Sequence, residues 1–208
     1  MTELSNAEIR RTLSEYNCVS SNEMSNSIRR YISLLLLWNR RISLTTVTAP
    51  TEIVRFHFGE SVFAASVVPI SCGRLVDVGS GAGFPGLPLR LASAEIRVVL
   101  IESNSKKAAF LSEVARELAL SGVEVFRGRM SELSNPTDKF DFVTARAVGK
   151  HYELLTWAHG RLRESGKVVL WLGQEGVEAV SGVGGWKWQT PVEIPGSRKR
   201  FILAGSPI

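Results

Sequence analysis

The sequence has few of the residues that bind metals or cross-link chains. It contains two cysteines in 208 residues, Cys18 and Cys72, and no CxxC pair. With only three histidines, His57, His151 and His159, a His-rich metal centre is not expected. This usage argues against a zinc site or a disulfide framework, and we expect no metal.

Long hydrophobic runs are also missing from the N-terminal part of the chain. The longest strongly apolar run there covers residues 34–38, far short of the roughly 20 residues that a membrane-spanning helix needs. Residues 1–8 lack the basic segment followed by an apolar one that marks a signal peptide. We therefore expect a cytoplasmic protein that makes no membrane contact, and we expect it to be a monomer.

The overall composition is that of a folded protein with a real core. Hydrophobic residues make up 44% of the chain and charged residues 22%, which argues against general disorder. The formal net charge is +5 and the isoelectric point is about 9.5. A mildly basic balance permits nucleic acid or another anionic partner without establishing one.

The first 70 residues are expected to be helical. Apolar residues recur there at steps of three and four, which is typical of an amphipathic helix. The stripe consists of Ile28, Tyr31, Ile32, Leu35, Trp38 and Ile42, widened by Leu34, Leu36 and Leu37. Residues 69–73 interrupt the pattern. We therefore divide the chain into an N-terminal helical extension, residues 1–70, and a second domain, residues 71–208.

Short apolar segments alternate with helical ones in the second domain. Strands are predicted over residues 74–78, 97–101, 123–127, 140–144 and 166–172, and helices over residues 85–93, 105–120, 152–162 and 174–180. Two further strands, 186–194 and 199–204, flank the turn signal Pro195-Gly196 and indicate an antiparallel hairpin. The pattern predicts a Rossmann-like α/β fold with a mostly parallel, seven-stranded sheet and helices on both faces.

The most informative stretch is residues 75–88, where the first strand of this domain enters a glycine-rich loop followed by a helix. Gly79, Gly81 and Gly83 allow the backbone to turn sharply and to approach a ligand closely. Pro85 suits the first position of a helix, whose N-terminus offers free N–H groups. A strand, loop and helix of this kind predict a cofactor of the nucleotide type.

Two cofactors fit this loop. Residues 81–86 match the GxGxxG of dinucleotide enzymes, and residues 79–83 match the GxGxG of S-adenosylmethionine (SAM) methyltransferases. Glu102, which lies 102 − 83 = 19 residues after Gly83, can accept hydrogen bonds from the ribose of either one. Asp77 lies in an otherwise apolar strand, and in a SAM site this position can lie near the cofactor's ammonium group. The predicted C-terminal antiparallel hairpin also favours SAM over NAD(P), because methyltransferase sheets usually end in an antiparallel strand.

The sequence also resembles a known family, the RsmG (GidB) methyltransferases, which act on guanine N7 in bacterial 16S rRNA. The similarity covers roughly residues 25–205. Its most specific segments are Leu75–Pro88 and Val143–Ala147. Smaller matches lie at Trp38-Asn39, at Leu44-Thr45, and at His57 with Glu60-Ser61.

The resemblance implies a class I SAM-dependent methyltransferase whose partner is 16S rRNA or the small ribosomal subunit. It implies cofactor contacts at Gly79, Phe84, Met130, Ser131 and Arg146, with Met130 and Ser131 flanking the adenine. His57 and Glu60 become candidates for the substrate side. No catalytic residue is assigned, because guanine N7 carries a free lone pair and needs no general base.

Three residues depart from what the family usually carries. Ser43, Phe56 and Leu172 stand where Asn, Arg and Lys are common, and we expect these positions to face RNA or the target base. Arginines of the N-terminal part and the cluster Arg198, Lys199 and Arg200 are candidates for phosphate contacts. Two alternative functions remain: a non-catalytic RNA-binding or ribosome-assembly protein that keeps the fold, and a small NAD(P)-dependent oxidoreductase.

Overall fold

A central sheet organises the part of the chain that the structure, a computed structural model, describes: residues 4–133, 135 and 138–208. Within these residues the sheet has eight strands. They are β1 (Gly73–Val78), β2 (Ile96–Glu102), β3 (Val123–Arg127), β4 (Phe140–Arg146), β5 (Leu162–Gly173), β6 (Trp186–Trp188), β7 (Val192–Glu193) and β8 (Arg200–Pro207). The order is β3-β2-β1-β4-β5-β8-β6, with β7 paired to β8. Strands β1 to β5 are parallel, and β8 runs antiparallel to β5.

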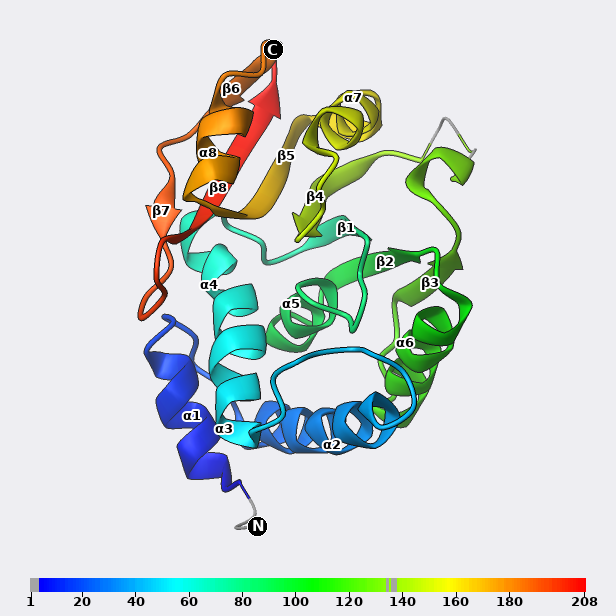
Figure 1. Cartoon of the computed structure of the whole chain (residues 1–208), viewed down its shortest axis with the longest axis vertical. Coiled ribbons are helices and arrows are strands. Elements are labelled where there is room, and N and C mark those ends of the chain that lie inside the picture. Colours follow the sequence, from blue (N-terminus) through cyan, green and yellow to red (C-terminus); the bar gives the residue numbers. More distant parts are fainter. Residues whose placement is uncertain (1–3, 134, 136–137) are drawn as a thin grey trace.

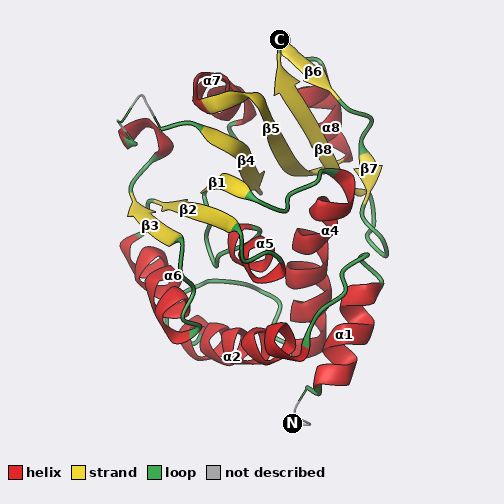
Figure 2. Cartoon of the chain, turned by 180° about the vertical axis from the view of Figure 1, so that it is seen from behind, coloured by secondary structure: helices red, strands yellow, loops and turns green. Residues whose placement is uncertain are grey.

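Helices cover both faces of this sheet (Figure 1). The N-terminal helices are α1 (Asn6–Ser14), α2 (Asn22–Asn39), α3 (Pro50–Ile53), the π-helix η1 (Val54–Gly59) and α4 (Glu60–Val67). They lie on one face together with α5 (Gly86–Ala92) and α6 (Ser105–Glu117), whereas α7 (His151–Arg161) and α8 (Gln174–Ser181) lie on the other (Figure 2). A short 3₁₀ turn, η2 (Met130–Glu132), follows β3.

The alternation of side chains along the strands explains the two layers. In β1, Leu75 packs into the apolar cluster that includes the N-terminal helices, α5 and α6. Its neighbours Val76 and Val78 pack into the second cluster, which includes α7 and α8. Successive residues of a strand point to opposite faces. Asp77 therefore points toward the same face as Leu75, where α5 begins.

The predicted fold class is confirmed, with one correction to the strand pattern. The expected strand over residues 186–194 is wrong as a single element, because it divides into β6 and β7 and gives eight strands in the described residues. Pro191 lies in the interruption and has no N–H group with which to continue a ladder. The predicted antiparallel ending is confirmed, since β6 and β7 both pair with β8.

The long helix of the N-terminal part, α2, is shorter than the apolar stripe that predicts it, which runs to Ile42. Helix α2 ends at Asn39. There the Asn39 side chain accepts hydrogen bonds from the backbone N–H groups of Leu44 (2.8 Å) and Thr45 (3.0 Å) and folds the chain back. Ile28, Tyr31, Ile32 and Leu35 are buried as predicted. The widening of the stripe is wrong at Leu37, which is 57% exposed.

One apolar cluster contains residues from the N-terminal helices and from the sheet, so the two parts of the chain share a core. The division at residues 70 and 71 stays a prediction. Among the described residues, no helix is long and apolar enough to cross a membrane.

Candidate functional site

The candidate site lies at the carboxyl ends of three adjacent parallel strands. The register pairs Val78 of β1 with Ile101 of β2 and with Ala145 of β4. The residues that follow are Gly79, Glu102 and Arg146, so three predicted cofactor residues lie at one edge of the sheet. Open α/β sheets bind ligands at this edge.

The glycine loop has the conformation that its sequence predicts. Gly79, Gly81 and Gly83 all have positive φ angles, of 71°, 58° and 90°. The N–H groups of Gly79 and Ser80 donate to the carbonyl of Ile101 at 2.9 and 3.0 Å, which ties the loop to β2. A Cβ atom on Gly81 would meet nothing closer than the Gly79 carbonyl, 3.8 Å away. The Gly81 position therefore faces open space in which a ligand could lie.

Pro85 stands one position earlier than predicted. It is the N-cap of α5, so the prediction that it occupies the first helical position is wrong. The bond between Phe84 and Pro85 is a cis peptide. The first residue of the helix is Gly86, whose N–H group points back toward Asp77.

Glu102 holds the loop from the neighbouring strand. One of its carboxylate oxygens accepts from the N–H of Gly81 at 2.8 Å, and the other accepts from the N–H of Asn104 at 2.7 Å. Each carboxylate oxygen can accept a further hydrogen bond. Glu102 can thus position the loop and still accept from a ligand hydroxyl, as predicted for a ribose.

Asp77 is fully buried beneath the loop. Its Oδ1 accepts from the Thr144 hydroxyl at 2.8 Å, and its Oδ2 accepts from the N–H of Gly86 at 3.3 Å. Burial raises the pKa of Asp77 from 3.8 to about 7, because the hydrogen bonds from Thr144 and Gly86 only partly offset the loss of water. A cation near this carboxylate would favour its charged form. The structure therefore gives Asp77 an internal role, and contact with the cofactor's ammonium group stays a prediction.

The raised pKa predicts a particular dependence of stability on pH. The folded protein holds a proton on Asp77 up to about pH 7, whereas the unfolded chain releases it near pH 3.8. The stabilisation is therefore fully present below pH 3.8 and is lost as the pH rises through 7. We expect the free energy of unfolding to fall between pH 5 and pH 8 more steeply in the wild type than in Asp77→Asn. Urea denaturation at the two pH values measures both slopes, and equal slopes would contradict the raised pKa.

The loop is also fixed from the N-terminal helices. The hydroxyl of Tyr31, on α2, donates to the carbonyl of Ala82 at 2.6 Å. The Tyr31 ring stacks on Phe84 with centroids 5.5 Å apart, and the imidazole of His57 stacks on Phe84 at 4.8 Å. A Cβ on Gly83 would overlap the Tyr31 hydroxyl. The side chain of Phe84 is thus packed between helices, which leaves its backbone as the part nearest the open side of the loop.

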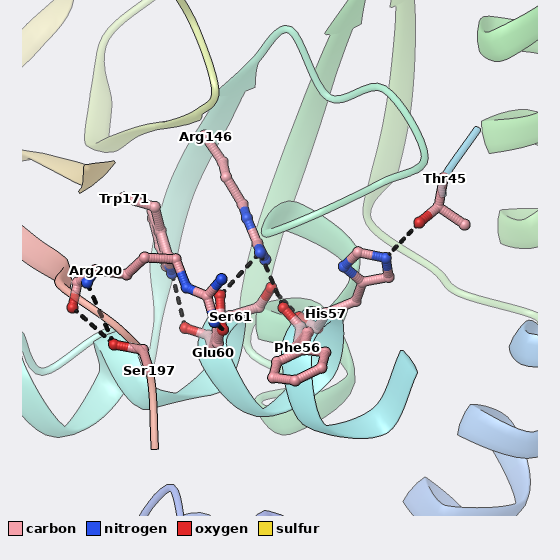
Figure 3. A network of polar contacts seen from close by, with 9 residues as sticks. All are labelled: Thr45, Phe56, His57, Glu60, Ser61, Arg146, Trp171, Ser197 and Arg200. Carbon is pink, nitrogen blue, oxygen red and sulfur yellow. Dashed lines mark hydrogen bonds and ion pairs between the residues drawn. The ribbon is translucent and has the colours of Figure 1, made fainter. Parts of the chain in front are cut away.

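Glu60 and Arg146 form an ion pair near the end of β4 (Figure 3). Glu60, at the start of α4, is 1% exposed, and its Oε2 lies 2.8 Å from Nη2 of Arg146. The same Nη2 donates to the carbonyl of Phe56 at 2.9 Å. Nη1 of Arg146 is buried, and it has no hydrogen-bond partner within the described residues. Arg146 is thus held in place while one of its nitrogens stays free to donate.

A second arginine, Arg200 of β8, approaches Glu60 from the opposite side (Figure 3). Its guanidinium pairs with Oε1 of Glu60 and lies 5.5 Å from the centre of the Phe56 ring. The carbonyl of Glu60 accepts from Nε1 of Trp171 at 2.7 Å. Burial raises the pKa of Glu60, and the two arginines work against that rise. Glu60 therefore connects the N-terminal helices with β4, β5 and β8.

His57 lies on the π-helix beside this cluster. Its Nε2 is 2.7 Å from the hydroxyl of Thr45. Burial and the nearby Arg146 lower the pKa of His57 from 6.5 to about 4. The imidazole is therefore neutral near pH 7, and it contributes a hydrogen-bonding group and a flat ring surface rather than a positive charge.

The remaining predicted positions are divided between surface and core. Met130 is half-buried and Ser131 is exposed, both on the turn after β3. Ser43 is exposed, and its contact with RNA stays a prediction, whereas Phe56 is half-buried under Arg200. The expectation for Leu172 is wrong, because its side chain is buried in the apolar cluster beneath α8.

Sequence reasoning missed the residues that support the site from a distance. Tyr31 was expected only as a core residue, although a hydroxyl within an apolar stripe signals a buried hydrogen-bond partner. No local sequence pattern indicates that Thr144 donates to Asp77 or that Trp171 donates to the carbonyl of Glu60. Arg200, a candidate for phosphate contact, is 42% exposed and also pairs with the buried Glu60, so its contact with RNA stays a prediction. In the described part of the chain, no three histidine, cysteine, aspartate or glutamate side chains gather as a metal site would require.

Comparisons with known proteins show which family this sequence resembles most clearly over its length. Residues 24–181 match the model of the family described as rRNA small subunit methyltransferase G. The ribosomal RNA small subunit methyltransferase G of Streptococcus pneumoniae (strain ATCC BAA-255 / R6) is 35% identical over 162 residues, which cover 76% of this chain and 68% of that protein. The protein of that name from Roseiflexus castenholzii is 37% identical over 185 residues, covering 84% and 79%.

Solved structures share the fold at low sequence identity. The precorrin-6y C5,15-methyltransferase of Geobacter metallireducens GS-15 has a TM-score of 0.61 at 14% identity, covering 80% of this chain and 91% of that one. The glycopeptide N-methyltransferase MtfA, complexed with sinefungin, has a TM-score of 0.62 at 12% identity, covering 73% and 87%. These likenesses show a class I methyltransferase fold. From the family match and the identity of its relatives, the chain belongs to the rRNA small subunit methyltransferase G family.

Proposed function

We propose that this protein is a SAM-dependent methyltransferase that methylates N7 of a guanine in bacterial 16S rRNA. The observation that carries the proposal is the glycine loop, whose open side at Gly81 lies between Glu102 of β2 and Arg146 of β4. Membership of the family supports rRNA as the substrate. The proposal includes action in the cytoplasm, as a monomer and without a metal, on 16S rRNA or the small ribosomal subunit.

The residues at the loop suit SAM chemically. Gly79, Gly81 and the backbone of Phe84 would border the cofactor, and Glu102 would accept from its ribose hydroxyls. Asp77 would lie near the ammonium group, Met130 and Ser131 near the adenine. The buried and unpaired Nη1 of Arg146 is a donor that a polar group of the cofactor can satisfy. When bound, SAM supplies a methyl group on a positively charged sulfur.

The protein needs to do little acid–base chemistry in this reaction. Guanine N7 has no proton to remove, so its lone pair can attack the methyl group directly. Catalysis then depends on holding the two reactants close and in line, an effect worth up to roughly 7–11 kcal/mol. His57 stays a candidate for the substrate side. A neutral His57 suits this role, because it adds no positive charge beside a guanine that becomes positively charged. Glu60 is 1% exposed and both of its carboxylate oxygens pair with arginines, so it would act there only by positioning Arg146.

Transfer of a labelled methyl group tests the proposal directly. We expect the protein to transfer methyl groups from SAM to 30S particles or to naked 16S rRNA from a strain that lacks the enzyme. Mapping the modified base should place the label on N7 of one guanine. SAM binding without transfer to either substrate would favour the non-catalytic RNA-binding alternative. Binding of NAD but not SAM would favour an oxidoreductase.

A further inference from the structure

A cavity of about 570 Å³ lies between the C-terminal end of α2 and the first turns of α6. These two helices run beside each other on the lower face of the sheet (Figure 1). The lining residues are Leu37, Trp38, Arg41, Ile42, Ser105, Lys106 and Ala109. None of them belongs to the predicted cofactor set. The cavity is thus a separate feature of the same helical layer.

The walls of this cavity are mainly apolar, and one of them is aromatic. Trp38 packs against Phe110 of α6, with ring centroids 5.7 Å apart and planes at 60°. This contact holds the indole in place while part of it remains accessible. Leu37, on the same wall, is 57% exposed. A fixed indole beside exposed aliphatic side chains offers a surface on which a flat ring can pack.

The rim of the cavity is positively charged. Arg41 and Lys106 are exposed side chains, one from each wall. Within residues 4–133, 135 and 138–208, neither cation forms an ion pair. Among the described residues that line the cavity, none carries a carboxylate. An apolar interior below unpaired cations suits a ligand with a flat ring and an anionic group.

We propose that this cavity binds one unpaired nucleotide of the RNA substrate. The base enters the cavity beside Trp38, and its phosphate lies near Arg41 and Lys106. Stacking on aromatic side chains and cations along the backbone are the usual means of holding single-stranded RNA. The volume lies within the range of about 300–1,000 Å³ that is usual for small-ligand sites. The inference rests on the proposed function and names a contact for its substrate outside the cofactor loop.

Binding of a fluorescein-labelled 12-nucleotide RNA without secondary structure, followed by anisotropy, tests this site. Arg41→Glu and Lys106→Glu should each weaken binding about tenfold at 50 mM salt and reduce its salt dependence. Ala109→Phe fills the cavity without changing charge. It should weaken binding about tenfold with an unchanged salt dependence. Lys187→Glu, an exposed cation on β6, is the matched control and should bind as the wild type does.

The outcomes separate a nucleotide site from its alternatives. Wild-type affinity in Ala109→Phe would overturn the proposal, since the cations would then form only a charged surface. Three other results would also overturn it. They are wild-type affinity in both charge variants, absence of RNA binding by the wild type, and binding of AMP as tight as that of the 12-mer. Loss of SAM affinity in Ala109→Phe would assign the cavity to the cofactor instead. RNA binding that needs the cavity, without methyl transfer to rRNA, would keep this site while rejecting the proposed function.

Discussion

Replacing Gly81 by arginine is expected to abolish SAM binding, with a loss of at least about 100-fold in affinity. Gly81 has a φ of 58°, and its Cβ position opens onto free space at the carboxyl edge of the sheet. A long side chain would therefore extend into the volume where the cofactor is predicted to lie. The left-handed backbone adds about 1–2 kcal/mol of strain for a residue with a Cβ. Isothermal titration with SAM and with S-adenosylhomocysteine measures the loss.

Gly81→Ala is the matched control for this substitution. It introduces the same backbone strain but only one methyl group, so we expect a much smaller loss of affinity. Thermal melting of both variants shows whether each remains folded. Retention of SAM affinity in a folded Gly81→Arg variant would show that the loop does not hold the cofactor.

Removing the Glu60 carboxylate is expected to have the largest effect on stability. Glu60→Ala leaves the guanidinium groups of Arg146 and Arg200 next to each other, without the buried anion between them. Breaking a buried ion pair by removing one partner costs about 3–5 kcal/mol. We expect a value near the lower limit, about 3 kcal/mol, because Arg200 is 42% exposed and is partly screened by water. Urea denaturation measures this difference.

Two further variants identify the cause of that effect. Glu60→Gln keeps the shape and an accepting oxygen, so it should cost less than Glu60→Ala. Arg200→Met removes the more exposed arginine and leaves Glu60 paired with Arg146. It should therefore cost less than either variant of Glu60. Changes within about 0.5 kcal/mol are typical of surface substitutions. If the free energy of unfolding of Glu60→Ala stays that close to the wild-type value, the buried ion pairs of Glu60 do not stabilise the fold as proposed.

The sequence allowed the glycine loop and its partners on neighbouring strands to be predicted, because local chemistry determines them. Three glycines after a short apolar strand define the turn. Glu102 follows the next strand along the chain, and the parallel topology then brings it to Gly81. Each feature is a local sequence pattern, a strand followed by three glycines and a strand followed by an acid, so the sequence alone is enough to find them.

The contacts that join distant segments could not be predicted in the same way. Glu60 and Arg200 are 140 positions apart, and only the folded sheet places β8 beside α4 (200 − 60). Nothing in the sequence around Leu172 indicates whether this position, near the end of a strand, is buried or exposed. Pro191 was visible in the sequence, and its missing N–H could have indicated the division between β6 and β7.

The hydrogen bond from Tyr31 to Ala82 has a consequence for the order of folding. It joins residues 51 positions apart, so it cannot form during synthesis until the loop after β1 has been made. Until then the aromatic side of α2 has no Phe84 to cover it. Contacts of long sequence separation form late because the chain between them must first be ordered. The N-terminal helices, although made first, therefore complete their packing only as the cofactor loop closes against them.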